Sequence, residues 1–121
     1  MDAASRTFVD RIALGATPFF TTFSGDGKTA YVCHQAPDGL AVIDASSRRL
    51  IGDHAFPSSD CIAPHQFMIS ADGSRGQLLC EGDHKSSGTY VLIDLATFTA
   101  TRTTPVGIYP VEMDLLPKLG T

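Results

Sequence analysis

The chain has 121 residues, of which 43% are hydrophobic, and this is the size and apolar content of one ordinary globular domain. Nine basic and thirteen acidic residues give a formal net charge of -4, and no cluster of Lys and Arg could follow a phosphate backbone or an anionic membrane. We therefore expect neither nucleic acid nor a membrane as a partner, and no segment has the length that a bilayer span requires.

The first fifteen residues interrupt their apolar positions with four charged side chains, so they lack the continuous apolar segment of a signal peptide. The three cysteines, Cys33, Cys61 and Cys80, are an odd number at irregular spacing. This is not the pattern of a disulfide framework. We expect free thiols and, as a default, a cytoplasmic location.

A repeat of 46 residues runs through the chain. Prolines stand at positions 18, 64 and 110, and the turn-like sequences Ser-Gly-Asp-Gly at 24–27 and Ser-Ala-Asp-Gly at 70–73 recur at the same interval. Asp-Gly between two strand-like segments favours a tight hairpin, because glycine supplies the positive φ angle that such a turn needs. The period and the turns predict an all-β protein built from β-propeller blades, which are four-stranded antiparallel sheets with strands A to D.

The expected elements follow in chain order. Residues 7–14 are predicted to be strand D of a preceding blade. Blade one, residues 15–61, has strand A after Pro18 and then strands B, C and D at 29–34, 39–44 and 48–55. Blade two, residues 62–106, has strand A after Pro64 and strands B, C and D at 76–81, 89–94 and 98–104. Residues 107–116 contain strand A of a following blade. This organisation amounts to about two complete blades with a partial blade at each end.

The two B strands are aligned through Tyr-Val-Cys at 31–33 and Leu-Leu-Cys at 78–80, at an offset of 47. This alignment places Cys33 and Cys80 at equivalent positions. We expect both to be small core residues.

Three motifs carry a resemblance to a known family. Gly-x-x-Pro begins the repeat, Ser-x-Asp-Gly-Lys-x-x-Tyr-Val follows, and Val-Ile-Asp ends strand C. Together they resemble the YVTN-type β-propeller repeat over nearly the whole chain, although residues 75–79 keep only its apolar pattern. Proteins with such repeats are similar to surface-layer proteins, lactonase-like proteins and the propeller parts of some redox enzymes. The resemblance implies an architecture and leaves the chemistry open.

Closed propellers have about four to eight blades, so two blades do not close a ring. Copies placed one after another would meet at a junction that has strands A and D but no B or C. The expected partners are therefore the chain itself or other propeller blades, in a homo-oligomer that exchanges strands or in a longer propeller of which this is a fragment.

Alternating strand directions bring the D–A and B–C loops to one face of every blade. The predicted ligand-binding residues lie on this face: His65, His34, Glu81, Asp83 and His84. His65 stands where the other repeats have Phe19 and Val111, so a position near the propeller axis has become polar. This substitution is the strongest functional signal in the sequence.

A transition metal held by His65, His34 and Cys61 is one interpretation, since imidazole and thiolate are common ligands of such metals. No recognised metal-ligand spacing is present, and a histidine after a proline often serves only to bond a backbone carbonyl. No catalytic residue is assigned, because the chain has no Gly-x-Ser-x-Gly motif and a Cys61–His65 pair defines no useful geometry.

We expect a noncatalytic β-propeller binding or scaffold module, without a cofactor, that binds a ligand or protein on the face of the D–A and B–C loops. The alternative is a fragment or subunit of a metal-dependent or lactonase-like propeller enzyme, which stoichiometric bound metal would distinguish. A third hypothesis, a purely structural repeat, predicts that His65→Ala changes little.

Overall fold

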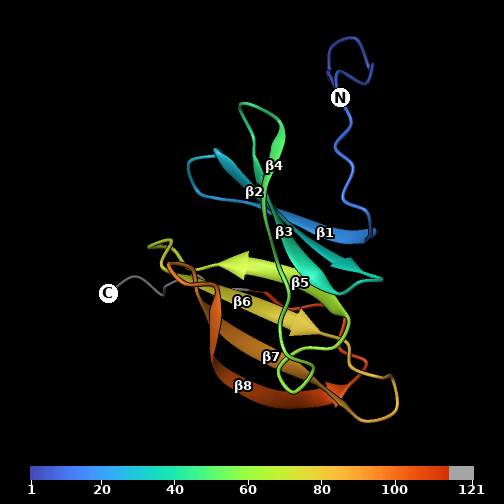
Figure 1. The fold of residues 1–121 in the computed structure, drawn as a ribbon, viewed down its shortest axis with the longest axis vertical. Coiled ribbons are helices and arrows are strands. Elements are labelled where there is room, and N and C mark those ends of the chain that lie inside the picture. The colour runs from blue at the N-terminus through green and yellow to red at the C-terminus, as the bar shows by residue number, and fades with distance from the viewer. Residues whose placement is uncertain (115–121) are drawn as a thin grey trace.

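The computed structural model describes residues 1–114, which contain two four-stranded antiparallel sheets (Figure 1). The first sheet consists of β1 (Thr17–Phe23), β2 (Thr29–Gln35), β3 (Gly39–Asp44) and β4 (Arg49–His54). The second consists of β5 (Pro64–Ile69), β6 (Arg75–Cys80), β7 (Ser87–Asp94) and β8 (Thr99–Ile108). In both sheets each strand pairs with the next in sequence, so the all-β prediction is confirmed. The described residues include no helix that is long and apolar enough to cross a membrane.

The two Asp-Gly turns form as the sequence predicts. Gly27 and Gly73 have φ angles of 70° and 72°, and their amides donate to the carbonyls of Ser24 and Ser70 at 2.9 Å each. In each turn the serine hydroxyl also donates to the aspartate carboxylate. This hydrogen bond is the main cause that lowers the pKa of both aspartates. Both turns are therefore stabilised by hydrogen bonds within their own four residues, 24–27 and 70–73.

Strand pairing corrects the alignment of the two B strands. Thr29 and Arg75 hold the same place in their sheets, each opposite the aspartate that ends the third strand. The offset is therefore 46 residues and not 47. Because successive side chains point to opposite faces of a strand, an error of one residue exchanges the two faces. Cys80 consequently corresponds to His34, and it is not equivalent to Cys33.

One apolar core joins the two sheets. Cys33 and Leu40 of the first sheet belong to the same buried cluster as Phe67, Leu78 and Val91 of the second, and all five are 0% exposed. Burial raises the pKa of the Cys33 thiol to about 12. Cys33 is therefore a small apolar core residue, as expected, and an unreactive one.

Cys61 and Cys80 form a disulfide, with Cα atoms 5.4 Å apart, and this corrects the prediction of three free thiols. Cys33 is the one free cysteine. The disulfide joins the β4–β5 loop to the end of β6. It therefore holds this loop next to residue 81, which directly follows β6. Sequence spacing did not reveal the pair, because the two residues meet only through the folded sheet.

The flanking segments differ from the prediction. Residues 8–14 form no strand, and neither do residues 109–114; residues 115 and 116 of the last predicted strand lie outside the described residues. A D or A strand pairs with the C or B strand of its own blade, and the described residues contain no such partner for either segment. Ile12 and Leu14 instead pack on the outer apolar face of the first sheet. Gln66 holds Met113 beside β5 through hydrogen bonds to its amide (2.7 Å) and carbonyl (3.0 Å).

Candidate functional site

Three of the predicted site residues meet at the D–A/B–C face, by which we mean the end of the sheets that carries loops 36–38, 55–63 and 81–86. Glu81 follows β6 directly and is only 3% exposed. His65 Nδ1 lies 2.5 Å from its Oε1 atom, and His84 Nε2 lies 2.6 Å from its Oε2 atom. Because an ionised carboxylate only accepts hydrogen bonds, both imidazoles donate. One buried carboxylate thus orients two histidines.

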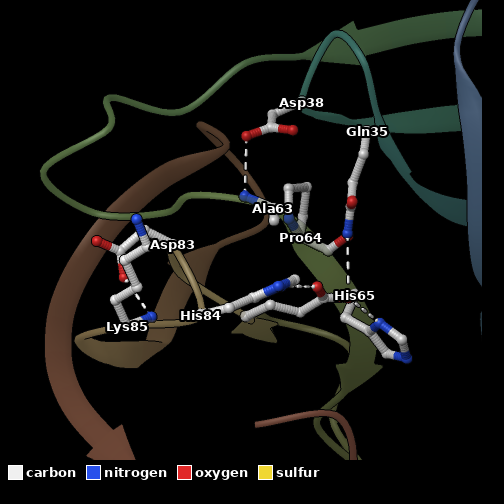
Figure 2. A network of polar contacts seen from close by, with 9 residues as sticks. Gln35, Asp38, Ala63, Pro64, His65, Asp83, His84 and Lys85 are labelled. Atoms are coloured by element: carbon white, nitrogen blue, oxygen red, sulfur yellow. Dashed lines mark hydrogen bonds and ion pairs between the residues drawn. The ribbon is translucent and has the colours of Figure 1, made fainter. Parts of the chain in front are cut away.

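Gln35 completes this group, which we call the Glu81 cluster: Glu81, His65, His84 and Gln35. The Gln35 Nε2 atom donates to Glu81 Oε1 at 3.2 Å and to the Pro64 carbonyl at 3.3 Å. No motif in the sequence indicated this residue. At the correct offset of 46, Gln35 and Glu81 are equivalent, so the pair links the same position in the two sheets. Figure 2 shows Gln35 reaching from the first sheet toward His65.

Asp38 is a second residue at this face that was not predicted from the sequence. Its carboxylate accepts a hydrogen bond of 2.8 Å from the backbone amide of Ala63 (Figure 2). Ala63 and Ile62 in turn accept backbone hydrogen bonds from Glu81 and Gly82, at 2.9 and 3.0 Å. The three loops of the D–A/B–C face are therefore connected to one another and hold the cluster in place.

A β-bulge presents His65. The pairing of β5 with β6 shifts between Pro64 and Gln66, so His65 has no cross-strand partner, and β1 has a similar shift around Phe19. Bulges re-aim side chains. The rings of Phe19 and His65 lie 5.4 Å apart, which shows that the equivalent positions are neighbours in space. In Figure 2 the second ring nitrogen of His65 points away from the rest of the network.

The 81–86 loop positions His84. Gly82 adopts a φ angle of 77°, and a Cβ atom on Gly88 would lie 2.4 Å from the Cys80 carbonyl, so both positions require glycine. Asp83 accepts hydrogen bonds from the backbone amides of Lys85 and Ser86, which are the main cause that lowers its pKa to about 2. Asp83, a predicted ligand residue, therefore shapes the loop. The rings of His84 and Tyr109 are also perpendicular to each other, with centroids 3.8 Å apart.

His34 lies apart from the cluster. It is 2% exposed, and its two ring nitrogens lie 2.7 Å from the Pro37 carbonyl and 2.7 Å from the Asp53 carboxylate. Both ring nitrogens are therefore engaged by oxygen atoms of the protein, and neither faces a metal position. His34 therefore stabilises the first sheet.

The predicted metal set is corrected by these contacts. Cys61 has no thiolate, because its sulfur is in the disulfide, and His34 and His65 bond different acceptors. Within residues 1–114, no group of three His, Cys, Asp or Glu side chains is arranged to hold a metal ion.

Two opposing effects act on the pKa of Glu81. Burial is the largest and raises it, because desolvation disfavours the charged form. Hydrogen bonds from His84, His65 and Gln35, together with the charge of His65, outweigh burial and bring the pKa below the ordinary value of 4.5. The folded protein therefore favours an ionised Glu81.

This shift predicts a loss of stability in acid. A carboxyl group with a lowered pKa in the folded state stabilises the protein above its unfolded-state pKa, and the contribution disappears as the pH falls through the folded-state value. We expect the difference in unfolding free energy between the protein and its Glu81→Gln variant to shrink as the pH decreases below about 4.5. Urea titrations from pH 6 to 3 measure it; a difference that stays constant over this range contradicts the prediction.

No family model matches this chain, and no curated protein matches it. Among solved structures, the chain is similar to hydrazine synthase from Kuenenia stuttgartiensis, with a TM-score of 0.76 and 21% sequence identity. The similarity covers 88% of this chain and 30% of that one. At this level of identity the likeness shows the fold alone, and this chain spans about a third of the length of the protein it matches.

Proposed function

We propose that this chain is a β-propeller segment of the YVTN repeat type and acts as a noncatalytic binding or scaffold module. A ligand or protein binds on the D–A/B–C face. The observation that carries the proposal is the pair of histidines, 25% and 50% exposed, that Glu81 orients from its buried position. A buried carboxylate is expensive to desolvate, and here it serves to hold two imidazoles at the surface.

The arrangement of the sheets supports the propeller assignment. Thr22 of β1 donates a hydrogen bond of 2.5 Å to the Phe67 carbonyl of β5, so the two first strands lie side by side. Met113 is held beside the same strand, β5, through Gln66. This proximity supports the proposal that three equivalent segments follow one another as the inner strands of a propeller. Exposed apolar side chains on β1 and β4 are surfaces that further blades would cover: Phe19, Phe20, Phe23, Leu50 and Ile51.

The contacts of the histidines favour binding over catalysis. Within residues 1–114, neither His65 nor His84 bonds a serine, threonine or cysteine that it could activate as a nucleophile. The metal-dependent alternative required His34 and Cys61 as ligands, and their contacts leave neither of them available. The cluster is suited to recognition, because each imidazole keeps one ring nitrogen for a ligand while the other is bonded to Glu81.

Fragment screening by NMR tests the binding function. We expect amide shifts at loops 36–38, 55–63 and 81–86, and none at the turns 24–28 and 70–74 of the opposite end. Glu81→Ala should abolish the shifts, whereas Asp26→Asn, at the opposite end, should preserve them. Shifts confined to the opposite end, or conversion of a bound compound, would contradict a noncatalytic site on this face.

Native mass spectrometry tests the assembly. If further blades cover the exposed apolar side chains, the purified chain should self-associate into discrete oligomers whose population grows with concentration. Phe23→Ser, at a side chain that is 58% exposed, should weaken this association without unfolding the protein. A monomer at every concentration up to about 100 μM, near the Kd of a weak contact, contradicts self-association.

A further inference from the structure

A row of four apolar or small residues crosses each sheet near its first turn. In the second sheet this row faces the first sheet and consists of Ile69, Gly76, Ile93 and Ala100. The equivalent row of the first sheet consists of Phe23, Ala30, Ile43 and Leu50. It lies on the outer face of the first sheet, and its end residues, Phe23 and Leu50, are 58% and 40% exposed. The outer face therefore has the residues of a sheet contact and is only partly covered.

The segment before the first strand of each sheet fills part of the same face. Before β5, Cys61 belongs to the core between the sheets and Phe56 packs against it. Before β1, Ile12 and Leu14 pack on the outer-face cluster that includes Ala41. The two segments thus cover equivalent faces, and the outer face differs from its equivalent because the first sheet packs against the second and only residues 12 and 14 pack here.

The second sheet carries a surface that matches this face. Within the chain it packs on Tyr31, Cys33 and Leu40 of the first sheet. Their equivalents, by cross-strand pairing, are Gln77, Leu79 and Tyr90. These residues lie on the far face, by which we mean the side of the second sheet that points away from the first. Tyr90 donates a hydrogen bond of 2.9 Å to Gln77, and both are half-buried.

We propose that the outer face of one copy docks on the far face of a second copy, in the arrangement that joins the two sheets within the chain. The inference rests on the proposed function and identifies the surfaces of the assembly. A second copy is the occupant because its far face carries the equivalents of the residues on which the contact within the chain is built. The contact is heterologous, since two different surfaces meet, and it can repeat from copy to copy around a ring.

Residues 109–114 compete with the partner for part of the far face. Within the chain, Thr22 of β1 bonds the Phe67 carbonyl of β5. Met113 is equivalent to Phe67 at the offset of 46, and Gln66 holds it beside β5 through two hydrogen bonds. The β1 strand of a partner would take this place. Docking therefore displaces a segment that forms no strand and is attached through one side chain.

Site-directed cross-linking tests the inference. Within the chain the rings of His54 and Phe98 stack with centroids 3.8 Å apart. Thr104 is equivalent to His54, and Arg48 is equivalent to Phe98. An equal mixture of Arg48→Cys and Thr104→Cys proteins, treated with a short bismaleimide, should give a covalent dimer of one copy of each, identified by its mass. Native thiols interfere little, because Cys33 is the one free cysteine and is buried.

Neither variant alone should cross-link, and neither should a mixture of Arg48→Cys with Ser86→Cys, at the other end of the second sheet. Adding Gln66→Ala to the Thr104→Cys chain should raise the yield about fivefold, because it removes the two hydrogen bonds to Met113. An unchanged or lower yield contradicts the displacement of residues 109–114. Should Gln66→Ala not fold, the mixture without it carries the test.

Arg48→Cys that cross-links to itself as well as to Thr104→Cys indicates a contact between like faces and overturns the inference. If native mass spectrometry shows oligomers and the mixture gives no mixed dimer, the assembly stands and the assigned surfaces are wrong. If the chain is monomeric and nothing cross-links, the assembly and the inference both fail.

Discussion

Glu81→Gln is expected to lower the free energy of unfolding by about 3 kcal/mol, because it disrupts a buried carboxylate that accepts three hydrogen bonds. Glutamine keeps one acceptor oxygen and replaces the other with an NH2 group. That group would face a histidine that donates, so two donors would meet at the buried position 81 and one imidazole would lose its acceptor. Urea denaturation at pH 7 measures the loss, and the melting temperature should fall by about 10 °C.

Glu112→Gln provides the matched control, because Glu112 is exposed and surface substitutions change stability by about 0.5 kcal/mol or less. The imidazole NMR signals of His65 and His84 give a second readout. In the native protein each ring should show a single tautomer set by Glu81, and in Glu81→Gln at least one ring should show both. A Glu81→Gln variant as stable as Glu112→Gln, with both tautomers unchanged, refutes the role assigned to this carboxylate.

Reduction of the Cys61–Cys80 disulfide should destabilise the protein by about 3 kcal/mol, because the bond closes a loop of nineteen residues in the unfolded chain. Both cysteines are buried, at 4% and 0% exposure, so reduction requires transient opening. The double variant Cys61→Ala with Cys80→Ala should show a loss of similar size in urea.

The effect should extend to the neighbouring site. The Glu81 amide donates to the Ala63 carbonyl at 2.9 Å, directly beside the disulfide, so its hydrogen exchange should become faster after reduction. Reductant added to the double variant should change nothing further, which separates the disulfide from any effect on Cys33. A protein that is demonstrably reduced and yet equally stable would show that the bond contributes nothing.

Hairpin turns and strand order could be predicted well because their causes are local. An Asp-Gly pair requires a particular turn wherever it stands, and a turn places the strands on both sides next to each other. At the B strands the prediction was wrong by one residue, because the similar sequences at 31–33 and 78–80 suggested an offset of 47. The cross-strand partners of Thr29 and Arg75 show that the offset is 46, the same interval as between the prolines and between the turns.

The candidate site was predicted in part. The reversal of strand direction was enough to assign His65, Glu81 and His84 to one face, and the structure brings these three together. His34 was predicted to lie with them for the same reason, but its ring bonds Asp53 within its own sheet. Knowing at which end of a strand a residue lies does not say which face its side chain occupies.

The sequence alone determined the all-β class, the repeat of 46 residues and the loops that share a face. Each of these depends on turn formation and strand direction, which are set by a few neighbouring residues. The tertiary structure alone decided the disulfide, the bulge that turns out His65, and the contact of Gln35 with Glu81. These features join segments that are 16 to 46 residues apart. Such contacts form only when the packing of two sheets brings their side chains within hydrogen-bonding or bonding distance, and no local pattern encodes that distance.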